Sequence, residues 1–352
     1  MLEIETPLGK RAIGNGAPCF IVAELSGNHG GDLKRAKALI DAAALAKVDA
    51  IKLQTYTPDT LTIDCKLAPF IIGSSHPQWE GLSLYELYQK SYTPWEWHAE
   101  LIAYAHQKKL VVFSTPFDVT ALNFLTPFHL PLIKIASFMV ENTLLLEKIG
   151  MAKKPVILSA GLTKEADLTS AIKILKENGT PYIILLHCIS AYPSLAEQMY
   201  LRRIQELSQR YQLDVGLSDH SLPPLAAIAS LALGACVIEK HLTLSRKDPT
   251  TDSAFSLEPH EFKELVENIR VAEAALAPPN TSMKQAEEES RIFKQSIYVV
   301  EDIEAHALFN TQNIRIIRPG FGLAPKYFKE VLGKRAKHPL KRGEALDWKN
   351  IV

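Results

Sequence analysis

The sequence has few cysteines and no excess of either charge. Its 352 residues include four cysteines, spaced far apart at Cys19, Cys65, Cys188 and Cys236, so neither a disulfide framework nor a zinc ribbon is indicated. Lys plus Arg and Asp plus Glu each number 39, which leaves no overall field to attract nucleic acid or an anionic membrane. An anionic ligand would therefore have to be bound by a local cluster of groups.

Long apolar segments are also lacking. The longest apolar stretch, Leu225–Ile238, is shorter than the roughly 20 residues that a helix needs to span a bilayer. The amino terminus has no basic region followed by an apolar one, as a secretory signal would have. These absences predict a cytoplasmic protein with neither a membrane nor a nucleic acid as partner.

What the sequence does have is a series of short apolar segments that end on polar residues. They are Phe20–Glu24, Ala50–Gln54, Leu110–Thr115, Leu132–Ser137, Val156–Ser159, Tyr182–His187, Asp214–His220 and Cys236–His241. Near-continuous apolar runs are typical of parallel strands buried on both faces, and most of the intervals carry helical periodicity. The pattern predicts an α/β fold, a (β/α)8 TIM barrel, whose active site would lie at the carboxyl ends of the strands.

The chain is too long for a barrel alone. After a predicted helix at Pro259–Leu276 the sequence becomes rich in proline and polar residues, which is typical of a linker. We therefore predict a barrel domain at 1–277, a linker at 278–295 and a small domain at 296–352. Because so short a domain can bury only a marginal core, we expect it to lean on another surface.

Two of the predicted strands end on histidines, His220 and His241. Adjacent parallel strands lie roughly 5 Å apart, so two imidazoles at their ends can converge on one divalent metal. The alternative is that each histidine is an ordinary core or loop residue, which is the commoner case for a single histidine.

The other strand ends carry groups suited to an anion. Lys52 and Lys134, with the hydroxyls of Thr115, Ser137, Ser159 and Ser218, would suit a ligand with a phosphate and a carboxylate. Alternatively, the lysines pair with nearby carboxylates and the serines merely end strands. Glu24 is a candidate general base or water-orienting group, or simply the ionic partner of Lys52.

Six motifs resemble the sialic acid synthase family. They are Ala23–His29, Lys52–Thr55, Ser114–Phe117, Lys134–Ser137, Gly216–His220 and Glu239–His241. The resemblance implies an enzyme that condenses phosphoenolpyruvate with an amino-sugar aldehyde to make a nine-carbon 2-keto acid. It extends to the end of the chain, because Arg315–Gly320 looks like part of the antifreeze-protein-like (SAF) domain that follows the barrel in that family.

The resemblance also implies roles for particular residues. His220 and His241 match the ligands of Mn²⁺ or Mg²⁺, and Glu24 matches a catalytic acid beside them. The positions that match phosphoenolpyruvate contacts are Lys52, Thr115, Lys134, Ser137, Ser159, Ser190 and Ser218, and those that match sugar contacts are Gln54, Tyr192, Asp252 and Arg318.

Several segments resemble one branch of the family, whose acceptor is 2,4-diacetamido-2,4,6-trideoxy-altrose: Gln54–Thr60, Leu84–Tyr88, Thr93–His98 and Asp252–Pro259. The N-acetylneuraminate and legionaminate branches are the alternatives. Tyr56, Tyr85 and Trp95 could contact the methyl groups of this deoxy-sugar, or could simply pack helices together.

Two positions depart from the family pattern. Met139 stands where an acid is common, unless Glu141 replaces that acid on the same strand face, and Ser190 stands where the sialic acid branch has a longer Asn. Arg318 matches an arginine that reaches the partner's barrel in that family, so the resemblance implies a domain-swapped homodimer. The alternative is a surface arginine in a turn.

Three other readings stay open. A barrel that condenses phosphoenolpyruvate with a phosphorylated sugar would need a second phosphate clamp, and a metal-dependent aldolase would use pyruvate and release no phosphate. A carbohydrate-binding protein could have kept the barrel without activity, although the presence of both histidines, both lysines and Glu24 argues against it.

Overall fold

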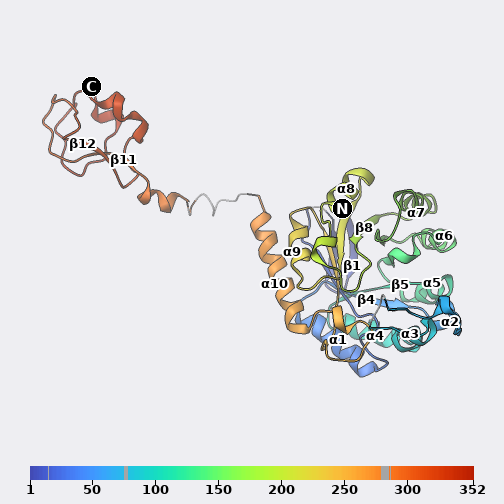
Figure 1. The fold of residues 1–352 in the computed structure, drawn as a ribbon. Helices are drawn as coiled ribbons and strands as arrows, with labels where there is room; N and C mark the ends of the chain where they lie inside the picture. Colours follow the sequence, from blue (N-terminus) through green and yellow to red (C-terminus); the bar gives the residue numbers. More distant parts are fainter. Residues whose placement is uncertain (15, 75–77, 279–284, 286) are drawn as a thin grey trace. The chain divides into compact units, whose positions relative to one another are not determined.

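The computed structural model describes residues 1–14, 16–74, 78–278, 285 and 287–352. It divides into two units, Met1–Leu276 and Ala277–Val352. The larger unit is the predicted barrel, in which helices surround a central group of strands (Figure 1).

The predicted (β/α)8 barrel is confirmed. Eight parallel strands close on one another in the order β10-β3-β4-β5-β6-β7-β8-β9. Their bounds are β3 Phe20–Glu24, β4 Ala50–Thr55, β5 Val111–Pro116, β6 Ile133–Ile135, β7 Val156–Ser159, β8 Ile183–Cys188, β9 Asp214–Asp219 and β10 Val237–His241. Each strand arises from one of the predicted apolar segments.

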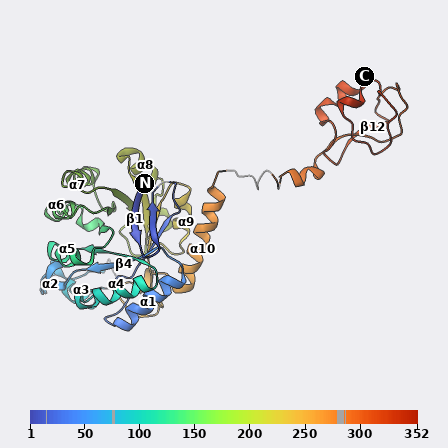
Figure 2. The same ribbon diagram turned by 180° about the vertical axis from the view of Figure 1, so that it is seen from behind.

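The helices form a layer around the strands (Figure 2). They are α1 Leu33–Leu45, α2 Pro58–Leu61, α3 Leu84–Ser91, α4 His98–Gln107, α5 Val119–Leu125, α6 Thr143–Met151, α7 Glu165–Glu177, α8 Arg203–Tyr211, α9 Leu225–Leu231 and α10 Pro259–Leu276. In α1 the Asp32 carboxylate caps the first turn by accepting from the Lys34 N–H, and Leu39 and Ile40 face the core. Capping and an apolar stripe thus start and dock this helix as its sequence predicts.

Alternate residues along each strand belong to two separate cores. Ile21, Ile51 and Val112 pack in the cluster that also includes the helices. Their neighbours Phe20, Ala50 and many equivalents form a second cluster inside the barrel. Because side chains alternate across a strand, the parity of a residue decides whether it faces the helices or the lumen.

A hairpin that the sequence analysis does not predict closes one end of the lumen. Strands β1 (Leu2–Thr6) and β2 (Gly9–Ile13) pair antiparallel. Leu2, Ile4 and Ile13 are buried in the same cluster as Phe20 and other residues at the amino-terminal ends of the barrel strands. The hairpin therefore seals the end opposite to the predicted active site.

The smaller unit has its own core. Its strands β11 (Ser296–Val299) and β12 (Ile314–Ile317) pair antiparallel, a short helix α12 spans Phe328–Val331, and the buried residues include Ile297, Phe309 and Leu346. Within the predicted linker, residues 279–284 and 286 lie outside the described residues, and Ser290–Phe293 form a 3-10 helix.

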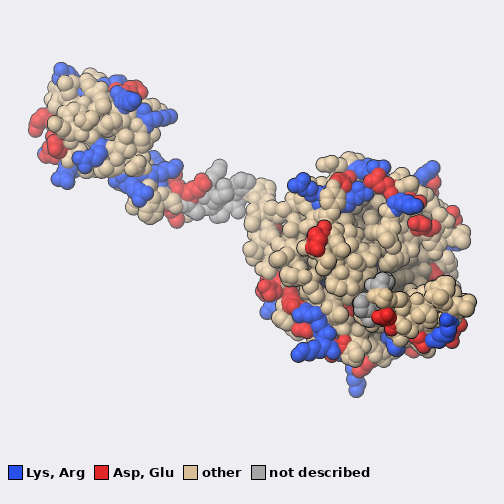
Figure 3. All heavy atoms as spheres, in the orientation of Figure 1, with Lys and Arg blue, Asp and Glu red and all other residues tan. Residues whose placement is uncertain are grey.

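The surface agrees with the balanced composition. On the face drawn in Figure 3, basic and acidic side chains are interspersed over the barrel unit. Among the residues that the structure describes, no helix combines the length and the apolar character needed to cross a membrane.

The hairpin generates a stability prediction. Ile13 is fully buried, so Ile13→Ala should destabilise the barrel by about 2–5 kcal/mol, through lost apolar burial and a residual cavity. Urea unfolding followed by circular dichroism would measure this. Leu8→Ala is the matched control, because Leu8 lies in the hairpin turn and is 71% exposed; its effect should stay within about 0.5 kcal/mol. Equal unfolding midpoints for the two variants would contradict a sealing role.

Candidate active site

A large cavity opens at the carboxyl ends of the barrel strands. Its volume is about 870 Å³. The predicted site residues that line it are Lys52, Gln54, Thr115, Lys134, Ser137, Ser159, Ser190, Tyr192, Ser218, His220, His241 and Asp252. Those that lie within strands share the inward parity, which is why residues far apart in the sequence meet here.

The two histidines lie next to each other in this cavity. Their ring centroids are 5.4 Å apart. Burial lowers the pKa of His220 to about 4, even though a hydrogen bond to the Ile189 carbonyl opposes the shift. Burial and the neighbouring His220 together lower the pKa of His241 well below its usual value. Both imidazoles are therefore neutral at pH 7, the form that binds metals.

The hydrogen bonds of the histidines leave suitable donor atoms for a metal. His220 Nδ1 lies 2.9 Å from the Ile189 carbonyl oxygen, and since a carbonyl only accepts, Nδ1 carries the proton and Nε2 keeps its lone pair. His241 Nδ1 lies 3.2 Å from the Ser26 hydroxyl. Because that hydroxyl donates to the Asp252 carboxylate, it accepts from Nδ1, and Nε2 of His241 keeps its lone pair as well.

A divalent ion fits this donor set only with help from other ligands. Among the described residues, no group of three or more His, Cys, Asp or Glu side chains is arranged to hold an ion. Glu239 Oε2 is buried in the same cavity, and within the described part of the chain it has no hydrogen-bond partner. The two imidazoles can therefore hold a divalent ion only when water or substrate supplies its remaining ligands, and the nearby Glu239 carboxylate adds negative charge to the cavity.

Four buried charges of alternating sign stand in the lumen. The Lys52 ammonium contacts the Glu24 carboxylate and lies 3.7 Å from Glu239 Oε1. Lys134 Nζ lies 3.7 Å from the same Glu239 oxygen. Every one of these four side chains is at most 6% exposed. The ion pairing that the sequence analysis leaves open for Glu24 is therefore present in this structure.

These charges adjust one another's protonation. Burial lowers the pKa of Lys52 to about 8; Glu239 opposes this shift, and repulsion from Lys134 adds to it. Burial would raise the pKa of Glu239, but Lys134 and Lys52 hold it below its usual value. At neutral pH Glu239 is thus ionised, and Lys52 is protonated but close to its titration range.

Hydroxyl groups surround the two lysines. Lys134 Nζ donates to Ser159 Oγ at 2.6 Å, and the Ser137 and Ser190 hydroxyls are hydrogen-bonded at 2.9 Å. Thr115 Oγ1 lies 3.4 Å from Lys52 Nζ, while Ser218 donates to Glu239 Oε1 at 3.2 Å. The arrangement combines two ammonium groups with several hydroxyls, as recognition of an anion with many oxygens requires.

Of the three aromatic residues that the sequence analysis singles out, only Tyr56 is among the residues that line the cavity. Tyr56 lines the cavity and packs against Tyr88 and Phe117, with centroids 5.7 and 5.2 Å away. Tyr85 instead donates to Asp59, and Trp95 stacks on Phe124 at 4.5 Å. Neither Tyr85 nor Trp95 is among the residues that line the cavity; Tyr85 contacts α2 and Trp95 contacts α5.

The sugar-contact candidates Tyr192 and Asp252 flank the histidines from the loops. The Tyr192 ring lies 4.4 Å from that of His220, and burial raises the pKa of its phenol. Burial also raises the pKa of Asp252, although the Ser26 hydroxyl and the Gly27 N–H donate to its carboxylate. The two residues place hydrogen-bonding groups next to the histidine pair.

The replacement of an acid by Glu141 is excluded by the structure. Met139 is buried in a 3-10 helix, Ser137–Met139, and lines the cavity, whereas Glu141 is exposed. The expectation assumed a strand, in which alternate residues share a face. Because the chain turns after β6, that periodicity does not apply, and an apolar thioether occupies the position.

Two predicted residues stand apart from the cavity lining. Glu24 is fully buried behind the surface, in contact with Lys52. Arg318 is exposed and belongs to the smaller unit.

Sequence reasoning missed other cavity residues, above all Glu239 and Trp79. Glu239 precedes His241 by two positions in β10, so the alternation of the strand could have placed it on the inward face. Trp79 lies in the long connection between β4 and β5, and its indole N–H donates to the Thr251 carbonyl at 2.9 Å. A contact between distant loops leaves no periodic signal in the sequence.

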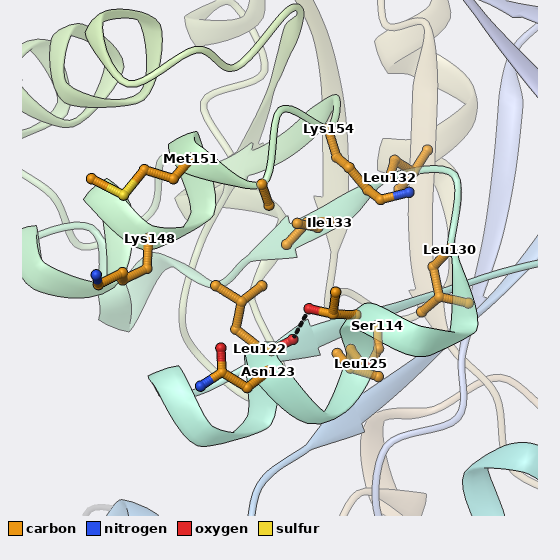
Figure 4. A pocket seen from close by; sticks show the side chains of 12 residues that line it. Ser114, Leu122, Asn123, Leu125, Leu130, Leu132, Ile133, Lys148, Met151 and Lys154 are labelled. Atoms are coloured by element: carbon orange, nitrogen blue, oxygen red, sulfur yellow. Dashed lines mark hydrogen bonds between the residues drawn. The ribbon is translucent and has the colours of Figure 1, made fainter.

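A second cavity, of about 310 Å³, lies outside the barrel. Figure 4 shows its mainly apolar lining, from α5, α6 and the outward side chains of β5 and β6, among them Leu122, Leu125 and Ile133. Lys148 and Lys154 also line it (Figure 4). The strands separate it from the lumen, so it is distinct from the candidate site.

Comparisons with known proteins agree with this geometry. Residues 39–280 match the NeuB family, and residues 294–352 match the SAF domain. The chain is 41% identical over 327 residues to pseudaminic acid synthase of Campylobacter jejuni subsp. jejuni serotype O:23/36, covering 93% of this chain and 95% of the relative. It is 41% identical over 336 residues to pseudaminic acid synthase of Helicobacter pylori, covering 95% and 98%.

A solved structure is similar over most of the chain. The crystal structure of N-acetylneuraminic acid synthetase from Leptospira borgpetersenii serovar Hardjo-bovis, in complex with citrate, has a TM-score of 0.70 and 33% sequence identity, covering 82% of this chain and 96% of the other.

The fold and the lumen define a (β/α)8 barrel with a cluster of lysines and hydroxyl groups beside a pair of histidines. The chain belongs to the NeuB family, a family of synthases, and its carboxyl-terminal unit contains a SAF domain. The resemblance seen in the sequence motifs is thereby confirmed.

The charge network generates a second prediction. Glu239→Gln leaves Lys52 and Lys134 with only one carboxylate between them, and an uncompensated buried charge costs about 3–5 kcal/mol. Urea unfolding should show this loss. The control is Glu177→Gln, which breaks an exposed pair with Lys173 and should cost less than about 1 kcal/mol. Equal unfolding free energies for the two variants would mean that Glu239 does not balance the lysines.

Proposed function

We propose that this protein is a pseudaminic acid synthase, which condenses phosphoenolpyruvate with 2,4-diacetamido-2,4,6-trideoxy-altrose and releases phosphate. The observation that carries the proposal is the lumen. There Lys52 and Lys134, with their surrounding hydroxyls, stand beside the histidine pair, in a chain closely similar to two enzymes of that name.

The lysines and hydroxyls would bind the anionic donor. In the absence of ligand the two ammonium groups are balanced by Glu24 and Glu239. A phosphate or carboxylate entering the lumen would compete for these ammonium groups, and Ser137, Ser159, Ser190, Ser218 and Thr115 could donate to its oxygens. Lys52 would then turn from Glu24 toward the ligand, which would free the Glu24 carboxylate to orient water or hold a proton.

His220 and His241 would hold Mn²⁺ or Mg²⁺, which when bound would polarise the aldehyde carbonyl of the sugar. C3 of phosphoenolpyruvate attacks C1 of the open-chain sugar, positive charge develops at C2 of the donor, and water adds there. Phosphate then leaves with cleavage of its C–O bond. In this reaction the lysines act mainly by positioning the donor and by electrostatic stabilisation.

The apolar part of the cavity supports the choice of sugar. Leu61, Ile72, Leu84 and Leu87 from the connection between β4 and β5 line it, together with Phe117 and Met139. Such a wall favours the 6-methyl and acetamido methyl groups of a trideoxy diacetamido sugar over the extra hydroxyls of N-acetylmannosamine. Gln54, Tyr192 and Asp252 would supply the polar sugar contacts.

A second candidate is synthesis of N-acetylneuraminate or legionaminate. The similarity to the Leptospira synthetase favours it, but at a lower identity than that to the two pseudaminic acid synthases. A non-catalytic carbohydrate-binding protein is disfavoured because such a protein would not need four buried charges beside neutral histidines.

We also propose that the enzyme acts in the cytoplasm, where its donor is made, as a domain-swapped homodimer in which Arg318 contacts the acceptor bound to the partner subunit. The smaller unit and the exposure of Arg318 support this arrangement.

The direct test is incubation of the full chain with phosphoenolpyruvate, Mn²⁺ and a panel of acceptors, followed by mass spectrometry and a phosphate-release assay. We expect a nine-carbon product and equimolar phosphate, with a specificity constant at least about tenfold higher for the diacetamido sugar than for N-acetylmannosamine. Comparable constants would favour the second candidate. Product formed from pyruvate without phosphate would indicate an aldolase, and no product from any acceptor would favour the binding protein.

The pKa of Lys52 sets a pH dependence. Because this pKa is lowered to about 8, Lys52 is charged below that pH and becomes neutral above it. The kcat/KM for phosphoenolpyruvate, which reports on the free enzyme, should therefore fall as pH rises through about 8, approaching tenfold per unit. Lys52→Arg, if active, should shift this limb upward, because Arg stays protonated. A profile that is flat to about pH 9.5 would contradict a role for the Lys52 charge in donor binding.

Mixed dimers test the role of Arg318. Arg318→Ala should raise the KM of the acceptor while leaving that of phosphoenolpyruvate nearly unchanged, and His220→Ala should remove turnover. Mixed after subunit exchange, the two variants should form heterodimers with one intact composite site, each approaching half of wild-type dimer activity. No recovery despite verified exchange would mean that the small domain does not serve the partner's barrel.

A further inference from the structure

A buried ion pair lies directly beside the two histidines but on the other side of their strands. Asp219 ends β9 and precedes His220, while Lys240 precedes His241 in β10. Lys240 Nζ lies 2.9 Å from Asp219 Oδ2, and both side chains are 0% exposed. Because neighbouring residues of a strand point to opposite faces, this pair faces the helical layer while the histidines face the lumen.

Lys240 brackets the backbone of His220. Its ammonium group donates to the Asp219 carbonyl at 3.1 Å and to the Ser221 carbonyl at 2.6 Å, the carbonyls on either side of His220. With the Asp219 carboxylate as third acceptor, all three N–H donors of the ammonium are used. A single side chain on β10 thus fixes the chain segment that carries His220.

Asp219 tightens the same turn from within. Its Oδ1 accepts from the Ser221 N–H at 2.8 Å and from the Ser221 hydroxyl at 2.6 Å. The His220 carbonyl is held separately by the Ser194 N–H at 3.1 Å. The segment 219–221 is therefore fastened on both sides of the histidine, and the lysine that fastens it is adjacent to His241.

We propose that Lys240 and Asp219 are positioning residues that set the separation of the two imidazoles and thereby the affinity of the histidine pair for a divalent metal. The inference rests on the proposed metal-binding role of His220 and His241. Stability alone gives no reason for the pair, because buried ion pairs are often replaced by apolar residues without loss. A rigid link between two ligand-bearing strands does require donors and acceptors at these places.

The test measures Mn²⁺ affinity of the full-length protein without substrates, by isothermal titration calorimetry. Asp219→Asn/Lys240→Met removes both charges together, so no unpaired ion is left. It also removes the hydrogen bonds of Lys240 to the carbonyls of residues 219 and 221. We expect the Mn²⁺ dissociation constant to rise about 10–100-fold in a variant that circular dichroism shows to be folded. At saturating Mn²⁺ the KM for phosphoenolpyruvate should change little, because of the proposed donor contacts only Ser218 lies on β9 and none lies on β10.

Two further variants sharpen the result. Lys173→Met/Glu177→Gln makes matching changes in an exposed pair on α7 and should leave Mn²⁺ affinity unchanged. Asp219→Asn alone keeps the contacts of Lys240 with both carbonyls, so its affinity should stay within about threefold of wild type. This single variant keeps the inference testable even if the double variant fails to fold. A loss of Mn²⁺ affinity of tenfold or more in Asp219→Asn would mean that the charge of Asp219, and not the hydrogen bonds of Lys240 to the two carbonyls, sets the affinity, and would contradict the inference.

His220→Ala distinguishes a failure of the proposed metal site from a failure of the positioning role of Lys240. Wild-type Mn²⁺ affinity in His220→Ala would overturn the metal assignment and, with it, this inference. Loss of binding in His220→Ala together with wild-type affinity in a folded double variant would leave the proposed metal site standing and overturn only the positioning role of Lys240.

Discussion

The chain of alternating charges in the lumen, Glu24, Lys52, Glu239 and Lys134, is the constraint on which the site depends. In a buried environment each charge is tolerated only because its neighbours balance it, so the strands that carry them must keep their register. The same balance prepares the site for its ligand. In the proposed reaction the two ammonium groups, which carboxylates hold in the absence of ligand, would turn to the incoming anion, and this exchange would couple donor binding to the release of Glu24.

Because side chains alternate along a strand, neighbouring residues at the strand ends have different surroundings: one faces the lumen and the next faces the helices. His220 and His241 face the lumen, where the proposed chemistry takes place, while their neighbours Asp219 and Lys240 face outward and hold the backbone by hydrogen bonds. At the ends of β9 and β10, the outward residues thus hold the backbone that carries the inward histidines. The hairpin at the opposite end closes that end of the lumen with apolar side chains.

The cavity joins two environments that match the two proposed substrates. Its floor is made of charges and hydroxyls suited to a small polyanion, and its wall is largely apolar, as a deoxy-sugar with acetamido groups requires. The wall comes mainly from the long connection between β4 and β5, which Trp79 ties to the loop after β10 through the Thr251 carbonyl. In the proposed function, donor and acceptor recognition would therefore reside in different parts of the chain.

The sequence by itself determined the barrel, the helix at Pro259–Leu276 and the inward direction of the strand-end residues, because apolar runs and alternation are local properties of the chain. Only the tertiary structure decided which charges meet across strands, that Glu24 pairs with Lys52 while Glu239 lies between the two lysines, and that Glu141 stays outside the cavity. These outcomes depend on the register and closure of the barrel and on the turn after β6. Such long-range geometry has no counterpart in the spacing of residues along the chain.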